Sequence, residues 1–311
     1  MKDLKPIHSA SPGRAKKPWK IRAFTKDVYR SIAHSWGRFW AIFAIVALGA
    51  GFYAGLRGTA PDMRATADAY FDDTNMMDIR LLSAFGFSQE DVEAIREVPG
   101  IEGIMAGHTA DVLSVIEGKE QAIRVHSLPQ DTSEENDDYI NRPVLVEGRL
   151  PEKSGECVVG RNKAETGVKI GDTITVSGDD WEDSFKCQTF EVVGMVDSSY
   201  YISFSLGSTS IGTGTLNLYM YILDEDFNQE AITDLYLTVE GASEESTFSE
   251  AYEEKVQAVK DALKPLGEER DDIRYEEVTA DSKKELEEGW AEYNDGKAEA
   301  ESQLQEAEAK L

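Results

Sequence analysis

The sequence has few of the side chains on which enzyme and metal sites are built. Its 311 residues include four histidines, and none of these lies in a metal-ligand spacing such as HExxH. Its two cysteines form no CxxC pair, which argues against a zinc site. Gly212 and Gly214 lie in a glycine-rich stretch, but no GK[ST] follows them, which argues against a phosphate-binding loop. We therefore predict that the chain is not an enzyme and binds no cofactor or metal ion itself.

Two cysteines are also too few for a disulfide framework. Cys157 and Cys187 both lie in apolar, alternating runs, ECVV and KCQTFEVV, where a buried free cysteine behaves as a small hydrophobic residue. We expect two free thiols. A disulfide between them stays open as the alternative, because an extracytoplasmic location would permit one.

Basic residues are scarce beyond residue 56. Residues 1–38 carry ten Lys or Arg and two Asp, a net charge of +8, whereas residues 57–311 carry 22 basic and 57 acidic side chains, a net charge of −35. A domain this acidic repels phosphates, so we exclude nucleic acid as a partner. We interpret most of the acidic surface as simply solvated.

One long stretch lacks charge altogether. Residues 39–56, FWAIFAIVALGAGFYAGL, would form a helix about 27 Å long, close to the roughly 30 Å hydrocarbon core of a bilayer. We predict a transmembrane helix there, with membrane-interface residues at both ends. These are Trp36, Arg38, Trp40 and Tyr53. A cleaved signal peptide is the alternative, but the apolar run exceeds the usual h-region.

The charge asymmetry across this helix predicts its orientation. Lys and Arg stay preferentially on the cytoplasmic side, so the N-terminus should be cytoplasmic and the main domain extracytoplasmic. Residues 1–18 are read as a basic cytoplasmic tail. Residues 19–38 carry apolar side chains at spacings of three and four, which predicts an amphipathic elbow helix on the inner leaflet.

The remainder predicts an α+β fold with two lobes. Residues 57–275 should form the extracytoplasmic domain, in which a first α/β lobe opens with a strand at 77–83, a helix capped by Ser88, and strands at 109–116 and 121–128. Glycine-rich short strands at about 140–200 predict an inserted β-rich lobe. Strands should return at 217–223 and 232–239, before a helix capped by Thr247.

The last stretch, residues 276–311, has a heptad pattern typical of a coiled coil. It stops in mid-heptad, so we expect an arm that is truncated here and that pairs with a returning helix. The predicted seam comprises Leu286, Trp290, Tyr293, Leu304 and Leu311.

Several motifs in order resemble one protein family. KDVYRSIAHSWGRFWAIFAIVALGAGFYAGL, APDMRATADAYFD and MMDIRLLSAFGFS are similar to the start of FtsX-like, MacB-type ABC transporter permeases. VEGRLPEKSGECVVG, GVKIGDTITV and FEVVGMVDSSYYIS are similar to the inserted part of their extracytoplasmic core.

The resemblance implies a permease subunit in the bacterial cytoplasmic membrane, whose extracytoplasmic domain has a porter-like lobe and an inserted β-rich lobe. It also implies three later membrane helices that this sequence lacks. It implies as partners the lipid bilayer, a second permease half or copy, and a cytoplasmic ABC ATPase subunit that binds the ATP. The implied activity is export or mechanotransmission. The alternative is a membrane-anchored extracellular scaffold or adhesion protein that binds a partner, such as a cell-wall enzyme, through its coiled coil.

The predicted topology can be tested by cysteine labelling of intact cells. An impermeant thiol reagent should modify a cysteine placed at Asp137, because that residue should lie outside, and should not reach one placed at Ser11. The unsubstituted protein is the control for its two native thiols. The reverse labelling pattern would contradict the orientation.

Overall fold

The computed structural model describes residues 23–161, 167–178, 181–203, 205–229 and 231–309. These residues form a mixed α+β structure with two compact units, Met1–Met63 and Arg64–Leu311. The predicted α+β class is therefore confirmed. We describe each unit by itself.

The first unit holds helix α1, Ala23–His34, and most of helix α2, Trp36–Asp73. The predicted apolar helix at 39–56 lies inside α2, which extends further than expected. Within the described residues α2 is the one helix long and apolar enough to cross a membrane, with a mean hydropathy of 1.9. None of its side chains is buried in the protein.

The predicted elbow at 19–38 differs from the structure at one end. Helix α1 ends at His34, and Ser35 separates it from α2, so Trp36 and Arg38 belong to α2. The Ser35 hydroxyl bonds back to the Ser31 carbonyl at 2.7 Å, an interaction that competes with helix continuation. Residues 1–22, including the predicted basic tail, lie outside the described residues.

The second unit contains two sheets and two longer helices. Its strands are β1 (Ile79–Phe87), β2 (Ile101–Gly107), β3 (Thr109–Ile116), β4 (Lys119–Leu128), β5 (Val144–Gly148), β6 (Glu156–Gly160), β7 (Thr173–Ser177), β8 (Thr189–Asp197), β9 (Leu218–Leu223) and β10 (Ile232–Val239). Its helices are α3 (Gln89–Arg96), the short α4 (Trp181–Ser184) and α5 (Glu250–Ala309), with 3-10 turns at Ser199–Tyr201 and Asp224–Asp226.

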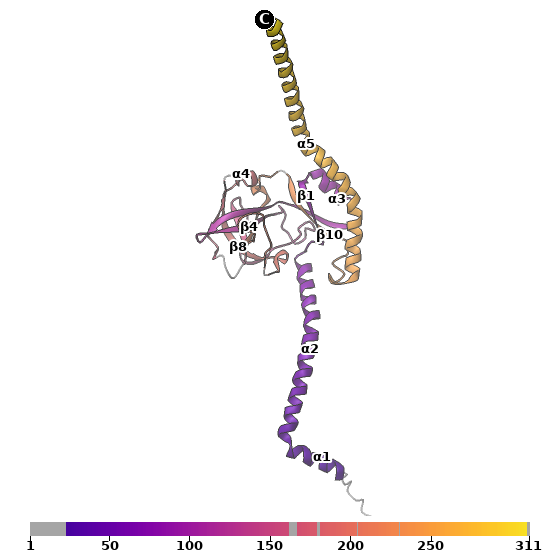
Figure 1. Ribbon diagram of the computed structural model, residues 1–311. Helices are drawn as coiled ribbons and strands as arrows, with labels where there is room; N and C mark the ends of the chain where they lie inside the picture. Colours follow the sequence, from indigo (N-terminus) through magenta and orange to yellow (C-terminus); the bar gives the residue numbers. More distant parts are fainter. Residues whose placement is uncertain (1–22, 162–166, 179–180, 204, 230, 310–311) are drawn as a thin grey trace, which may run out of the picture. The chain divides into compact units, whose positions relative to one another are not determined.

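Strands β1, β10 and β2 form a three-stranded antiparallel sheet in that order. Helix α3 and the first turns of α5 lie beside it (Figure 1). Apolar residues of the sheet, such as Leu235 and Leu237, pack in one core with Val256, Val259 and Leu263 of α5. Burying this stripe of α5 fixes the helix on the sheet.

The other sheet has seven strands and closes on itself. Strand β8 pairs with β6 along one edge, and its other edge pairs first with β7 and then with β5. The order β8-β6-β9-β4-β3-β7 therefore returns to β8 as a barrel, with β5 as an added strand. Fully buried side chains fill it, including Ile123, Phe190 and Met220.

The barrel is larger than the inserted lobe that the sequence predicted. Residues 140–200 supply β5, β6, β7 and β8, but β3, β4 and β9 lie outside that range. The sequence pattern assigns β3 and β4 to the first lobe, because it predicts no strand between α3 and β3. Strand β2 completes the first sheet instead. The sequence does not predict this strand, because its sequence IEGIMAG is poor in residues that favour strands.

Two capping predictions have different outcomes. The Ser88 hydroxyl accepts the Asp91 amide and the Asp91 side chain accepts the Ser88 amide, so the predicted capping box on α3 is confirmed. At α5 the capping side chain is Ser249, which accepts the Tyr252 amide at 3.2 Å, rather than Thr247. The Thr247 amide has another partner, described below.

Both cysteines are free, as predicted. Cys157 lies in the barrel core, where burial raises the pKa of its thiol to about 12. A thiol in this state reacts only when the barrel opens. Cys157 is therefore an internal probe of barrel stability.

The Phe190→Ala variant tests the packing of the barrel. Truncating a buried Phe costs about 3–5 kcal/mol, so Cys157 in the native full-length protein should react at least about 100-fold faster with a thiol reagent. Val146→Ala on the exposed strand β5 is the control and should leave the rate unchanged. Mass spectrometry of the Cys157 peptide gives both rates. Equal rates in the two variants would show that Phe190 does not support the barrel.

Candidate functional site at the junction of helices α2 and α5

Helix α2 ends in the second unit at two residues that bond to a distant loop. The Thr74 hydroxyl donates to the Tyr70 carbonyl at 2.8 Å and closes the last turn. Asn75 follows with a φ of 47°, a left-handed conformation that asparagine tolerates and that ends helices. The chain then enters β1.

Asn75 and Asn141 hold this helix end against the loop that precedes β5, and we call the pair the asparagine clasp. The side-chain amide of Asn75 donates to the backbone carbonyls of Asp137 and Tyr139. The backbone carbonyl of Asn75 accepts the backbone amide of Asn141 at 2.8 Å. The Asn141 side chain accepts the Met77 amide at 3.1 Å. Asn141 is also left-handed, with a φ of 54°, and is buried.

The same helix end contacts the start of α5. The Asp68 carboxylate accepts the Thr247 amide at 2.7 Å, and the Arg64 guanidinium lies over the Phe248 ring at 5.7 Å. These contacts leave Phe248, which precedes the first residue of α5, half-exposed. The last turns of α2 and the N-terminus of α5 are thus joined directly.

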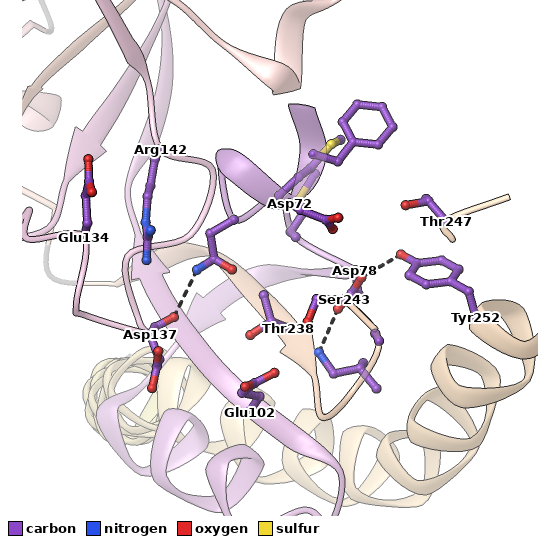
Figure 2. A pocket seen from close by; sticks show the side chains of 16 residues that line it. Asp72, Asp78, Glu102, Glu134, Asp137, Arg142, Thr238, Ser243, Thr247 and Tyr252 are labelled. Carbon is purple, nitrogen blue, oxygen red and sulfur yellow. Dashed lines mark hydrogen bonds between the residues drawn. The ribbon is translucent and has the colours of Figure 1, made fainter. Parts of the chain in front are cut away.

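Asp78 connects both helices to the sheet. Its carboxylate accepts the Val239 amide at 2.7 Å and the Tyr252 hydroxyl at 2.6 Å, which ties β1 to β10 and to α5 (Figure 2). Burial raises the pKa of this carboxyl, although both hydrogen bonds favour its ionised form. An ionised acceptor in a half-buried place gives stronger hydrogen bonds than a neutral one.

A pocket of about 420 Å³ opens where these segments meet. Figure 2 shows its wall, to which the end of α2, strands β2 and β10, the loop before β5 and the start of α5 contribute. The lining residues are Phe71, Asp72, Asn75, Met76, Met77, Asp78, Glu102, Glu134, Asp137, Arg142, Thr238, Val239, Ala242, Ser243, Thr247 and Tyr252.

The pocket is strongly acidic. Burial raises the pKa of Asp72, and the nearby charges of Asp68, Asp73 and Asp78 raise it further. Burial and the neighbouring carboxylates also raise the pKa of Glu102. Carboxyls that repel one another bind a proton, or another cation, more readily than isolated ones do.

A second contact holds α5 further toward its C-terminus, at Arg270. The buried Asp91 of α3 forms an ion pair with Arg270. Burial opposes ionisation of Asp91, but hydrogen bonds from Ser88 and Arg270 outweigh it and lower the pKa of the carboxyl. The first five turns of α5 are therefore held at both ends, by Asp78 and Asp91.

The four predicted interface residues all lie on α2, in the first unit. The rings of Trp36 and Trp40 are 6.2 Å apart, and the Arg57 guanidinium lies 5.9 Å from the Tyr53 ring. Tyr53 follows Trp36 by about 26 Å along the helix. That separation fits the two edges of a hydrocarbon core, and contact with lipid stays a prediction. Arg38, the fourth, is exposed.

The predicted seam residues lie on α5 beyond its core contacts. Leu286, Trp290 and Tyr293 are all about 60% exposed, at 62%, 58% and 60%. The Trp290 and Tyr293 rings meet edge to face at 5.8 Å. The side chain of Leu304 and the whole of Leu311 lie outside the described part, so the seam stays a prediction.

Sequence reasoning missed the residues that form the junction. Thr74-Asn75 after a helix was a readable stop signal, since asparagine is common in the left-handed position. Its partner Asn141 lies 66 residues away and had no local signal. Long-range pairs of this kind appear only in the folded chain.

No family model matches the chain, and no curated protein matches it. Several solved structures resemble it, among them the following two. The first is the extracellular domain of the noncanonic ABC-type transporter YknZ from Gram-positive bacteria, which is 14% identical in sequence. The match covers 51% of this chain and 75% of the YknZ chain, with a TM-score of 0.33. The second is the periplasmic region of MacB from Actinobacillus actinomycetemcomitans, which is 11% identical in sequence. The match covers 61% of this chain and 76% of the MacB chain, with a TM-score of 0.30.

Replacing Asn75 tests the asparagine clasp. Asn75→Ala loses two hydrogen bonds and puts alanine, which adopts the left-handed conformation less readily than asparagine, at this position, a combined cost of about 2–4 kcal/mol. Asn75→Gly loses the same bonds without the strain. Hydrogen exchange of the Asn141 and Arg142 amides, which donate to the carbonyls of Asn75 and Thr74, should accelerate more in the alanine variant than in the glycine variant.

The control for this measurement is the Gly155 amide, which donates to Asp226 beside the barrel and should be unaffected. Unchanged exchange at Asn141 in both variants would show that the helix end is held by other contacts.

Proposed function

We propose that the chain is the N-terminal part of a membrane-spanning permease subunit of the FtsX-like, MacB-type ABC transporter class. The single observation that carries this proposal is the charge-free run at residues 39–56 between a segment of net charge +8 and a domain of net charge −35. The ordered motifs that resemble this family support it. The helical state of α2 and the absence of buried side chains along it also fit a lipid-facing segment.

The junction supports a mechanical role within that class. Movement at the end of α2 is passed to α5 through Asp68 and the Thr247 amide, and to the three-stranded sheet through the asparagine clasp and Asp78. Each link joins segments far apart in sequence. A domain so connected transmits displacement better than one on a flexible linker. We therefore favour mechanotransmission or export over a simple anchoring role.

In this proposal the chain performs no chemistry. A separate cytoplasmic ABC ATPase binds and hydrolyses ATP, and a second permease half or copy completes the assembly. The buried histidine of the barrel agrees with this. Burial lowers the pKa of His126 to about 3, and its ring bonds to the Tyr201 hydroxyl at 2.6 Å, so it is a neutral structural group.

A scaffold or adhesion role is the second candidate, and the exposed Leu286, Trp290 and Tyr293 favour it. Large apolar side chains aligned on one face of an isolated helix are typical of a surface that binds another helix. Such a surface also fits a permease whose arm meets another segment or protein. The arm alone does not separate the two functions.

Purification of the protein from its native membranes after mild cross-linking separates them. The permease proposal predicts that an ABC ATPase co-purifies in near-equimolar amount, and that Trp290→Asp leaves its recovery unchanged. Removing a residue on the extracytoplasmic arm should not affect a cytoplasmic contact. Glu287→Gln, at an exposed position of the same helix, is the control for effects of any substitution in the arm on expression and purification.

Recovery of an extracytoplasmic protein alone, lost in the Trp290→Asp variant and kept in Glu287→Gln, would contradict the permease proposal. That outcome would establish the scaffold role.

A further inference from the structure

A second pocket lies between strand β1 and helices α3 and α5, which lie side by side (Figure 1). It shares no lining residue with the junction pocket. Its volume of about 420 Å³ lies within the range of small-molecule sites. Most of its wall is apolar and includes Leu81, Phe87, Ile95, Leu263 and Leu266. Such a wall favours an occupant that is largely hydrocarbon.

One face of α5 forms the helical side of this pocket. Leu263, Gly267, Arg270 and Arg274 recur at spacings of four, three and four, so they share one face of the helix, and all four line the pocket. A Cβ at Gly267 would meet no other atom within 4 Å. A glycine in a helix interior costs about 1 kcal/mol relative to alanine, and no close contact requires one here. The missing side chain leaves room for an occupant.

The two arginines of this face differ in how they are paired. Arg270 forms an ion pair with the buried Asp91. Arg274, whose side chain is 20% exposed, donates from Nη1 to Glu277 at 3.1 Å and has no other hydrogen bond to the described residues. Its Nε is buried without a partner. A guanidinium has five N–H donors, so most donors of Arg274 remain for an anion, and a carboxylate matches their geometry.

The remaining charged residues of the lining leave this cation in place. Lys264, Glu268 and Asp271 are exposed and solvated, and none of them forms an ion pair with Arg274 in the described part of the chain. Glu277 is itself 42% exposed and pairs with Arg274 across one helical turn, an interaction worth only a few tenths of a kcal/mol. The pocket thus combines an apolar wall with one weakly paired cation.

Strand β1 makes a peptide strand a poor occupant. It is an edge strand, but Leu82 pairs with Asp234 and Phe87 with Ile232, so residues 83–86 stand opposite a single residue of β10. A bulge of this kind interrupts the row of amides and carbonyls that an added strand would need. A hydrocarbon chain with one charged end needs no such row.

We propose that this pocket binds a fatty acid of medium chain length, with its carboxylate on Arg274 and its hydrocarbon chain across Gly267 against the apolar wall. This inference goes beyond the proposed permease function and does not depend on it. The occupant would contact β1, α3 and α5 together.

Equilibrium dialysis of radiolabelled octanoate against the full-length chain in lipid nanodiscs tests the proposal, at about 0.15 M salt and neutral pH. Empty nanodiscs give the uptake into lipid, which is common to all variants. Octanoate should bind saturably with one site per chain. The neutral 1-octanol should bind about tenfold more weakly or less, because it lacks the charge that Arg274 recognises.

Two glycines of α5 give a matched pair of variants. Gly267→Leu places a side chain in the pocket and should weaken octanoate binding about tenfold or more. Gly289→Leu makes the same change at an exposed position outside the lining and should change the affinity less than about twofold. Both substitutions raise helix propensity, so a loss of binding in Gly267→Leu does not report unfolding.

The charge is tested by a second pair. Arg274→Gln should weaken octanoate binding about tenfold or more, the loss typical of a charge-assisted hydrogen bond, and should leave the binding of 1-octanol unchanged. Lys260→Gln removes the same charge at an exposed position of α5 outside the lining and should have less than about a twofold effect. Circular dichroism establishes that each variant is folded.

Each of the following results would overturn the proposal. Unchanged octanoate binding in Gly267→Leu would place the fatty acid elsewhere, and equal weakening by Arg274→Gln and Lys260→Gln would show non-specific attraction. A blocked peptide of alternating valine and glutamate that binds more tightly than octanoate, and is lost in Gly267→Leu, would show that a strand fills the pocket. Dimers of the native chain that dissociate in Gly267→Leu would show that a second copy fills it.

Discussion

The arrangement of the second unit depends on how the end of α2, which belongs to this unit, is held by the loop before β5 and by the start of α5. A helix that leaves a lipid-facing segment must be attached to a folded domain, or its movements are lost in a flexible connection. Here the attachment consists of directional hydrogen bonds, from the asparagine clasp to the loop before β5 and from Asp68 to the Thr247 amide. Two asparagines accept left-handed conformations to make it possible. The strain is offset by four hydrogen bonds that join residues more than 60 positions apart.

The sheet and the barrel have different roles in this arrangement. The three-stranded sheet carries α5 on an apolar stripe, with Asp78 and Asp91 fixing the helix at two levels. The barrel is a closed structure with its own core. A further buried cluster, in which Met105 and Tyr236 of the three-stranded sheet pack with Val158 and Tyr221 of the barrel, holds the two sheets together. A rigid barrel gives the loop before β5 a fixed position. The loop in turn gives the end of α2 a fixed partner.

Local sequence patterns predicted the elements well and their pairing poorly. The helix at 39–56, the Ser88 capping box and the strands at 109–116 and 232–239 follow from short-range hydropathy and capping rules. Closure of the barrel depends on one edge of β8, which pairs with β7 over part of its length and with β5 over the rest. This long-range pairing has no local signal in the sequence. The junction pocket was missed for the same reason, since in a chain with 59 acidic residues no single carboxylate stands out.

The central claim is that the end of α2 and the start of α5 move as one body. Electron–electron double resonance between nitroxides at Ala69 and Glu254, two exposed positions on these segments, tests it most directly in the full-length protein in lipid nanodiscs. We predict one narrow distance distribution in the native chain, which broadens when Asp68→Asn and Asn75→Ala are combined. A broad or bimodal distribution in the native chain would contradict the account.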